Sequence, residues 1–195
     1  MIFLSVPAAG KKARAQNPNV VYEALIAEMA AEDTQALEKL YEQTKTMVYG
    51  FALSLTKNAQ DAEDVTQDTY VRLFQAAKSY RPQGKPMAWI LTITRNLFLM
   101  KLRKKKNQGA PFQDYLVSPE KQEQDFSANS TNRIVLATVL QTLSDEERQI
   151  VMLHSVTGLK HREIAEILQI PLSTALSKYR RALSKLKKRL KEEKP

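Results

Sequence analysis

A chain of 195 residues, 43% of them hydrophobic, can bury one sizeable core or two small ones. Its 30 lysines and arginines exceed its 21 acidic residues, and the net charge of +9 favours a polyanionic partner such as nucleic acid or an acidic membrane surface. Cysteine is absent, which excludes disulfides, thiolate zinc sites and cysteine nucleophiles and fits a reducing cytoplasm.

Membrane insertion and export are not expected. No apolar run approaches the roughly 18 to 20 residues that span a bilayer. The apolar residues at the start of the chain precede its first positive charges, whereas a secretory signal has the basic region first. We therefore expect a soluble protein located in the cytoplasm.

Apolar residues recur at steps of three and four along most of the chain, which contains only five glycines, so the sequence predicts an all-α fold. Residues 1–32 are expected to form an N-terminal leader and one short helix. A core helix is expected from Thr34 to about residue 57, and a second begins near Asp61. After a loop with two prolines and a glycine, a third helix at 86–106 is apolar at first and strongly basic at its end.

Residues 108–132 lose this periodicity and collect polar residues, which is typical of an interdomain linker. Solvation is one explanation for the acidic residues of this segment, which are Asp114, Glu120, Glu123 and Asp125. Helical order resumes from 133, and Ser144 with Glu147 has the spacing of a capping box. We therefore predict two small helical domains, 33–107 and 133–195, joined by a flexible linker.

The second domain contains the strongest local signal, a helix-turn-helix: a short helix, a turn at 169–171 and a longer helix. The longer helix buries residues at steps of three and four. Its polar and basic side chains, suited to base edges and phosphates in a major groove, are Ser173, Thr174, Ser177, Lys178, Arg180 and Arg181. Between Lys160 and Lys194 there are 11 basic and 4 acidic residues, although a solvated basic face would look the same.

Four stretches taken together, in this order, resemble the extracytoplasmic-function group of the sigma-70 family. They are DAEDVTQDTYVRLF, WILTITRN with its basic tail, LSDEERQIVMLHSVTGLKHREIAEIL and the terminal helix. The resemblance spans roughly Thr34 to Leu190. It implies that 33–107 is sigma region 2 and 133–195 is sigma region 4, and that the protein binds core RNA polymerase and promoter DNA. It also implies control by an anti-sigma factor.

The resemblance assigns polymerase binding to the first stretch, at Asp61, Asp64, Gln67 and Asp68. On a helix that advances 100° per residue, the three aspartates lie within about sixty degrees of one another. Such an acidic stripe can pair with basic residues of a partner, and a merely solvated face is the alternative.

The resemblance also assigns opening of the minus-10 element and capture of an unstacked base to the loop and third helix. Capture requires aromatic platforms, amide or hydroxyl groups for base edges, and cations for the backbone. The residues that supply this set are Tyr80, Trp89, Thr92, Arg95, Asn96, Lys101, Arg103 and Lys104. Trp89 has a second interpretation as a core residue, because its neighbours are apolar. The helix-turn-helix would read the minus-35 element as a duplex.

Three residues depart from the family pattern. Gln169 stands in the turn where glycine is common, and a left-handed conformation there costs on the order of 1 kcal/mol. Leu176 stands where relatives often have lysine, and Met100 where they often have aspartate. Promoter preference therefore does not transfer from relatives.

An enzyme is not expected, because the chain has no Walker-type loop, HExxH motif or nucleophile elbow. No cofactor, metal or small-molecule substrate is expected either, and His154 and His161 are interpreted as structural. The main rival function is a dimeric helix-turn-helix regulator that binds duplex DNA without core polymerase. A more distant rival is a protein that binds RNA or an anionic membrane.

Overall fold

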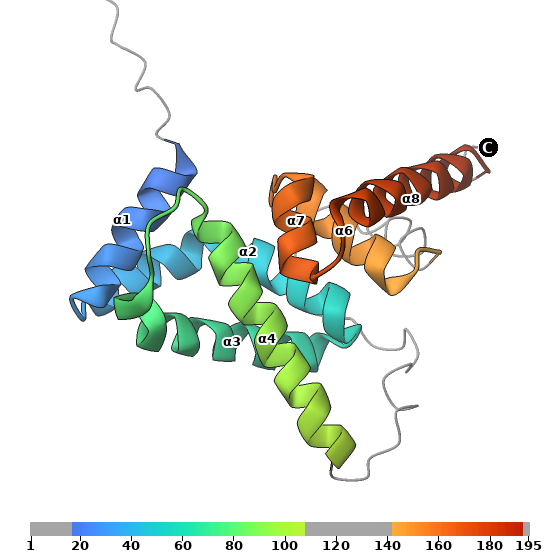
Figure 1. Cartoon of the computed structure of the whole chain (residues 1–195). Coiled ribbons are helices and arrows are strands. Elements are labelled where there is room, and N and C mark those ends of the chain that lie inside the picture. The colour runs from blue at the N-terminus through green and yellow to red at the C-terminus, as the bar shows by residue number, and fades with distance from the viewer. Residues whose placement is uncertain (1–16, 108–141, 193–195) are drawn as a thin grey trace, which may run out of the picture.

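The computed structural model describes residues 17–107 and 142–192. Within these two ranges the chain forms α-helices and one short 3-10 helix, with no strand, which confirms the all-α prediction (Figure 1). Three predicted features lie outside the described residues: the leader up to residue 16, the helix at 133–141 and the acidic linker with Asp114, Glu120, Glu123 and Asp125. Within the described ranges, no helix combines the length and apolar character that crossing a membrane requires.

The first helical unit consists of α1 (Pro18–Ala30), α2 (Thr34–Thr56), α3 (Ala59–Ala76), the 3-10 helix η1 (Ala77–Ser79) and α4 (Pro86–Asn107). Side chains just before three of these helices accept hydrogen bonds from backbone amides of the first turn, which stabilises each start. The capping residues are Asn17, Asp33 and Asn58.

Side chains from all four α-helices of this unit meet in one core. Ile26 of α1, Phe51 of α2, Leu73 of α3 and Ile90 of α4 are each almost completely buried there. Helix α1 therefore packs into the core of the first unit, although the sequence grouped it with the leader.

The second helical unit consists of α6 (Asp145–Ser155), α7 (His161–Leu168) and α8 (Leu172–Glu192). The predicted capping box is present: the Ser144 amide donates to the Glu147 carboxylate at 2.9 Å, and the Glu147 amide donates to the Ser144 hydroxyl at 3.3 Å. Gln169 ends α7 with φ 56° and ψ 44°, so the turn adopts the left-handed conformation without a glycine.

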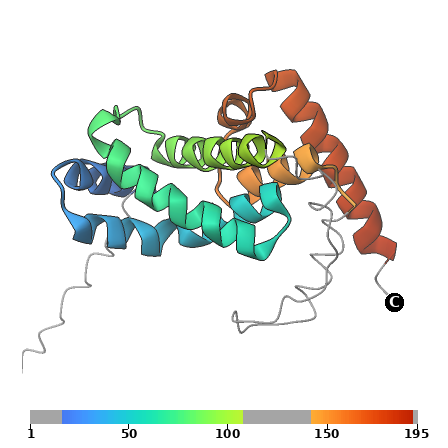
Figure 2. The same ribbon diagram turned by 90° about the horizontal axis from the view of Figure 1, so that it is seen from below.

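The two units pack against each other through α6 on α2 and α7 on α4. Figure 2 shows α6, α7 and α8 gathered at one end of the first unit, with α1 at the other. Gly50 of α2 lies at the contact with α6, because a Cβ there would lie 3.5 Å from the sulfur of Met152 on α6, which is an ordinary van der Waals distance. At the end of α2, Lys57 forms an ion pair with Asp145 at 2.7 Å.

Candidate nucleic-acid interface

The loop between η1 and α4 places Tyr80 against Trp89. Their ring centroids are 4.7 Å apart and the planes are tilted by 49°. The Tyr80 hydroxyl donates a hydrogen bond to the Glu23 carboxylate of α1 at 3.0 Å. Burial raises the pKa of Tyr80 and the Glu23 carboxylate raises it further, so the hydroxyl stays protonated and can donate at physiological pH.

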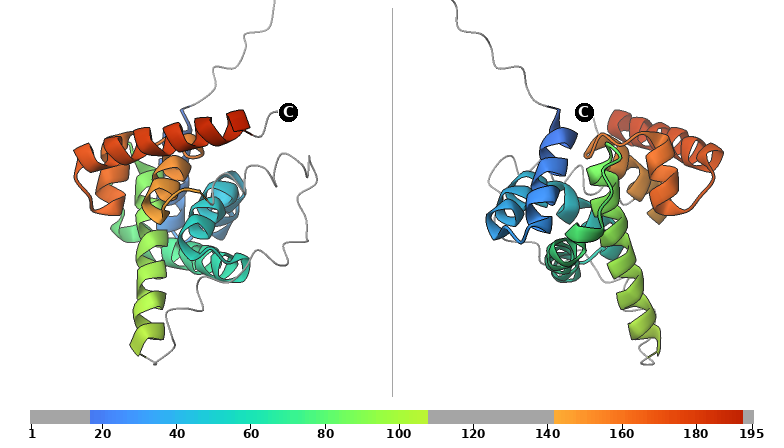
Figure 3. Two further views of the ribbon diagram at one scale, coloured as in Figure 1. Left: turned by 90° about the vertical axis from the view of Figure 1, so that its right-hand side faces the viewer. Right: turned by 60° about the vertical axis from the view of Figure 1, so that its left-hand side comes forward.

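Helix α4 carries a polar and basic stripe that begins at this aromatic pair. At 100° per residue, Trp89, Thr92, Asn96 and Arg103 lie within about sixty degrees of one another. Asn96, Arg103 and Lys104 are exposed, whereas Trp89 and Thr92 are half-buried. The basic end of α4 projects beyond the neighbouring helices (Figures 1 and 3), where it can approach a polyanion.

Helix α7 covers part of this stripe and lines one side of an open cavity of about 340 Å³. Tyr80, Trp89 and Thr92 line this cavity from the first unit, and Glu163, Glu166 and Ile167 of α7 line it from the second. The other lining residues, all from the first unit, are Ser79, Arg81, Gln83, Lys85 and Ala88.

Arg95 also faces α7, because its guanidinium donates to the Leu168 carbonyl at 3.3 Å. Desolvation by these contacts lowers the pKa of Arg95. The Lys85 ammonium lies 4.0 Å from the Glu166 carboxylate. Two cations near the aromatic pair, Lys85 and Arg95, thus contact α7 in this arrangement.

The proposed polymerase-binding residues lie on one side of α3. Asp64, Gln67 and Asp68 are exposed and Asp61 is half-buried, while Val65 and Leu73 on the other side enter the core. Asp68 forms an ion pair with Lys101 of α4 at 2.8 Å. This pair connects the acidic face of α3 to the basic half of α4.

Helix α8 presents a mostly exposed polar face. Ser173, Ser177, Arg180 and Arg181 are exposed and lie within about 100° around the helix. The Arg181 guanidinium donates to the Ser177 hydroxyl at 3.4 Å, an interaction within the same face.

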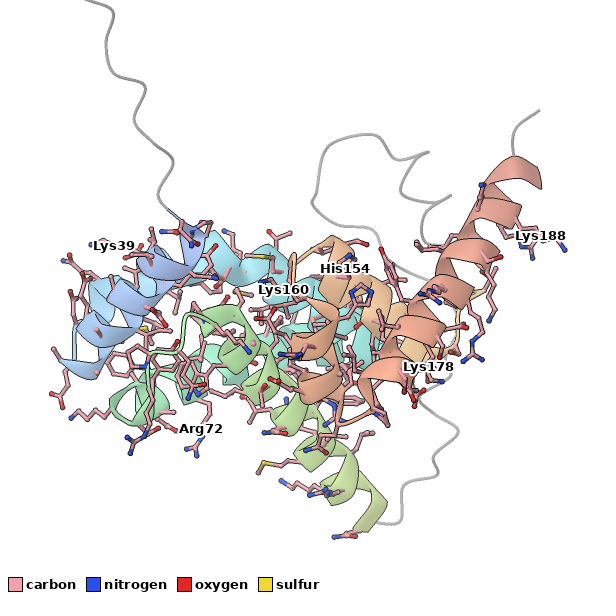
Figure 4. All side chains as sticks on the ribbon, turned by 45° about the horizontal axis from the view of Figure 1, so that its top comes forward. Lys39, Arg72, His154, Lys160, Lys178 and Lys188 are labelled. Atoms are coloured by element: carbon pink, nitrogen blue, oxygen red, sulfur yellow. The ribbon has the colours of Figure 1, made fainter. Side chains whose placement is uncertain are left out.

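Two further candidates on α8 lie to one side of this face. Lys178 is mostly buried and forms an ion pair with Glu146 of α6 at 2.5 Å. Figure 4 shows Lys178 near the start of α8 and Lys188, which is not a candidate, further along the same helix. Thr174 is half-buried. The face that points outward is therefore formed by Ser173, Ser177, Arg180 and Arg181.

His154 of α6, His161 of α7 and Tyr179 of α8 form an aromatic cluster inside the second unit. The three centroid distances are 4.5, 4.8 and 4.7 Å. The His154 Nδ1 donates to the Leu159 carbonyl at 2.9 Å, and the His161 Nε2 is buried without a hydrogen-bond partner among the described residues. Burial, and then the nearby His154, lower the pKa of His161. The cluster connects all three helices.

Sequence reasoning missed three residues around the aromatic pair: Glu23, Arg81 and Lys85. Arg81 and Lys85 could have been predicted from the sequence, because they stand near Tyr80 in the loop and a captured nucleotide needs cations for its backbone. Glu23 carried no comparable signal, because it lies 57 positions from Tyr80 in the chain.

The comparisons with known proteins match this geometry. The model of Sigma-70 region 2 matches residues 40–108, and the model of Sigma-70, region 4 matches residues 133–186. Together the two matches span more than half of the chain and define a sigma-type transcription factor. The chain belongs to the sigma-70 family, in its extracytoplasmic-function (ECF) group.

Named relatives have the same character. The ECF RNA polymerase sigma factor SigK of Mycobacterium sp. (strain KMS) is 28% identical over 168 residues, which cover 84% of this chain and 87% of SigK. The ECF RNA polymerase sigma factor SigE of Mycolicibacterium smegmatis is 32% identical over 155 residues, which cover 77% of this chain and 60% of SigE.

Two solved structures share the fold. Sigma factor RpoE from Bartonella quintana, in complex with the anti-sigma factor NepR, aligns with a TM-score of 0.63 at 22% identity, covering 80% of this chain and 99% of that one. CnrH, in complex with the cytosolic domain of CnrY, aligns with a TM-score of 0.61 at 22% identity, covering 89% and 99%.

Proposed function

We propose that this sigma factor directs RNA polymerase to promoters with three separate surfaces. Its domains are 33–107 (region 2), with α1 packed on it, the linker 108–132, and 133–195 (region 4). It acts on core RNA polymerase and promoter DNA in the cytoplasm, as a regulatory protein that catalyses no reaction itself. The observation that carries this proposal is the Tyr80–Trp89 pair at the start of the polar and basic stripe on α4.

The aromatic pair and the stripe have the chemistry that capture of an unstacked minus-10 base requires. Tyr80 and Trp89 offer ring faces, and stacking of a base on an aromatic ring contributes about 1–3 kcal/mol. Thr92 and Asn96 offer hydroxyl and amide groups for base edges, and the cations beyond them suit the phosphate backbone. Promoter melting would then be driven by this capture and would need no hydrolysis of a nucleotide.

The second DNA contact is the exposed face of α8. Serine hydroxyls and arginine guanidinium groups bind base edges and phosphates, and the second helix of a helix-turn-helix normally enters the major groove. We assign to this face the reading of the minus-35 duplex.

The acidic face of α3 is the proposed contact with core polymerase. Carboxylates in a row complement a basic partner surface, and such complementarity favours the correct partner and speeds association. An anti-sigma factor is a further proposed partner, because the structurally similar RpoE was solved in complex with the anti-sigma factor NepR.

Family membership disfavours the rival interpretation as a dimeric regulator that binds duplex DNA without polymerase. A regulator of that kind has no need of either an acidic face on α3 or a base-capture site on α4. The two interpretations differ in one measurable property, which is the dependence of promoter recognition on core polymerase.

Run-off transcription with bacterial core polymerase and a genomic promoter library tests the proposal. Addition of the protein should produce specific new transcripts, which Asp64→Arg should remove by reversing a charge on the proposed polymerase face. The matched control is Glu63→Arg, since Glu63 is exposed on α3 but lies about 100° further around the helix. Tight specific duplex binding by the protein alone, with no new transcripts, would instead establish the dimeric regulator.

A further inference from the structure

Helix α1 lies outside the segment that matches Sigma-70 region 2, which begins at residue 40. It nevertheless runs beside the loop that carries Tyr80, as Figures 1 and 3 show. This placement gives α1 direct access to the loop that the proposed function uses for base capture.

Three donors of the loop converge on one carboxylate oxygen of α1. The Glu23 Oε1 accepts from the Tyr80 hydroxyl at 3.0 Å, the Gln83 amide at 3.1 Å and the Gly84 amide at 2.8 Å. Hydrogen bonds to an ionised acceptor are stronger than those between neutral groups. One side chain therefore fixes both the aromatic residue and the backbone of the loop.

Two other contacts join α1 and the turn that follows it to the loop and to η1. The Asn19 amide group of α1 donates to the Gly84 carbonyl at 3.0 Å, and Lys78 of η1 pairs with Glu32, just after α1, at 2.7 Å. Gly84 has a φ of +70°, a conformation that favours glycine and turns the loop so that its amide reaches Glu23. The loop has no strand or helix of its own to satisfy these backbone groups.

The position of the Tyr80 ring follows from these contacts. Its hydroxyl donates to Glu23, and its ring is tilted against Trp89, with which it lines the cavity. Without the carboxylate, the ring and the loop backbone could move relative to Trp89. The angle and spacing of the two aromatic faces would then no longer be fixed.

We propose that Glu23 is a positioning residue for base capture, which makes α1 a part of the promoter-recognition apparatus although Glu23 itself does not touch the base. This inference rests on the proposed function of Tyr80. It predicts that Glu23 controls both the affinity for a single-stranded minus-10 segment and the discrimination among bases at the captured position. Assembly with polymerase and reading of the minus-35 duplex would not depend on it.

The test uses holoenzyme made from the full chain and core polymerase. The probes are four fluorescent single-stranded oligonucleotides with the minus-10 sequence of a promoter that the holoenzyme transcribes, one for each base at the captured position. Glu23→Ala should weaken binding of the preferred oligonucleotide roughly tenfold and reduce the difference among the four, by analogy with loss of a stacking contact.

Three variants separate positioning from general damage. Glu23→Gln should retain most of the affinity, because its amide oxygen can still accept from the loop. Asn19→Ala should weaken oligonucleotide binding less than Glu23→Ala does. Glu28→Ala should change nothing, because Glu28 is an exposed acid of α1 without a contact to the loop among the described hydrogen bonds and ion pairs. Affinity for core polymerase and for a minus-35 duplex should be unchanged in every variant.

Tyr80→Ala makes the two proposals separable. Tyr80→Ala is expected to weaken oligonucleotide binding and to reduce the difference in affinity among the four oligonucleotides. If it does so while Glu23→Ala and Asn19→Ala do not, the role of Glu23 is overturned and the base-capture assignment stands. If Tyr80→Ala itself has no effect, the base-capture assignment fails and the role of Glu23 fails with it. An equal loss of core affinity and oligonucleotide affinity in Glu23→Ala and Glu23→Gln would reduce Glu23 to a folding role and reject the inference.

Discussion

The two candidate DNA surfaces are held in opposite ways. On α8, Ser173, Ser177 and Arg180 are exposed, and the Arg181 guanidinium donates both to the hydroxyl and to the backbone carbonyl of Ser177, within the same face. On α4 and its loop, Tyr80 is bound to Glu23 and Arg95 is bound to the carbonyl at the end of α7. The surface on α8 is open, whereas the surface on α4 and its loop is held by α1 on one side and partly covered by α7 on another.

The difference fits the two tasks that we propose. A helix that enters a major groove needs to project from its domain, whereas a site for an unstacked base needs fixed walls. The cover is a separate matter, because Ile167 and Glu166 of α7 line the cavity beside Trp89. Separation of the second unit from the first would therefore expose more of that side of α4 to DNA.

The largest effect is expected for a substitution at Gly50 that separates the two helical units. Gly50→Phe would place a ring against Met152 and should force α6 from α2, at a cost of about 1–3 kcal/mol for overpacking. Trp89 is the single tryptophan of the chain and lies beside α7, so its fluorescence should shift to the red and become more sensitive to acrylamide.

Gly50→Ala is the control for that experiment. The added Cβ makes an ordinary contact with Met152, and alanine in place of glycine inside a helix should stabilise α2 by up to about 1 kcal/mol. Its tryptophan spectrum should match that of the unmodified protein. Identical spectra for the phenylalanine variant would show that the cover on α4 does not depend on this contact.

A second prediction compares two cations of α8. Arg180→Ala should weaken binding to a minus-35 duplex by about 1–2 kcal/mol, which corresponds to roughly tenfold, because its guanidinium is exposed on the proposed reading face. Lys178→Ala should have a smaller effect, since Lys178 is engaged by Glu146. Fluorescence anisotropy at several salt concentrations measures both, and equal losses would contradict the distinction between them.

A third, smaller effect concerns pH and the second unit. The pKa of His161 is lowered in the folded state by burial, whereas in the unfolded chain it lies near its usual value of about 6.5. The unfolded state therefore binds more protons below about pH 6.5, so stability that is present above this pH is lost as the pH falls toward the folded-state pKa.

Thermal unfolding measured between about pH 7.5 and about pH 5.5 checks this prediction, because carboxylates titrate mostly below that window. His161→Phe keeps a ring beside His154 and Tyr179 and removes the titrating group. Its melting temperature should vary less with pH than that of the unmodified protein. An unchanged slope would assign the pH dependence to other groups.

The smallest effect is expected for the ion pair between the units. Lys57 and Asp145 are partly exposed, with side-chain exposures of 30% and 55%, so their coupling should stay below about 1 kcal/mol and decrease with salt. A double-mutant cycle with Lys57→Ala and Asp145→Ala, followed by chemical denaturation, gives the coupling directly. A value well above this range would mean that the pair, rather than apolar packing, holds the second unit in place.

Local features of the fold were predictable from sequence. The core helix α2 begins at Thr34 as expected, and the capping box at Ser144 forms. Each depends on residues within a few positions of one another. Helix α3 begins two residues before the expected Asp61, because Asn58 caps it, and its end tightens into the 3-10 helix η1.

Contacts between distant segments were not predictable in the same way. Periodicity marks the apolar side of α1 but does not identify its partner, so the place of Ile26 in the common core was not foreseen. The same limit applies to Glu23 with Tyr80 and to Arg95 with Leu168, which join positions 57 and 73 residues apart. The chemical types of the site residues were readable, but their neighbours in space were not.

The hydrogen bonds between α1 and the loop have a consequence for protein engineering. A chimera that receives only the loop of another sigma factor would contain backbone amides and an aromatic residue that are adapted to the first helix of that other protein. The Glu23 carboxylate of this chain would then meet donors at the wrong positions. Exchange of promoter preference between such proteins should therefore transfer two separate stretches together, the loop near Tyr80 and the first helix that supports it.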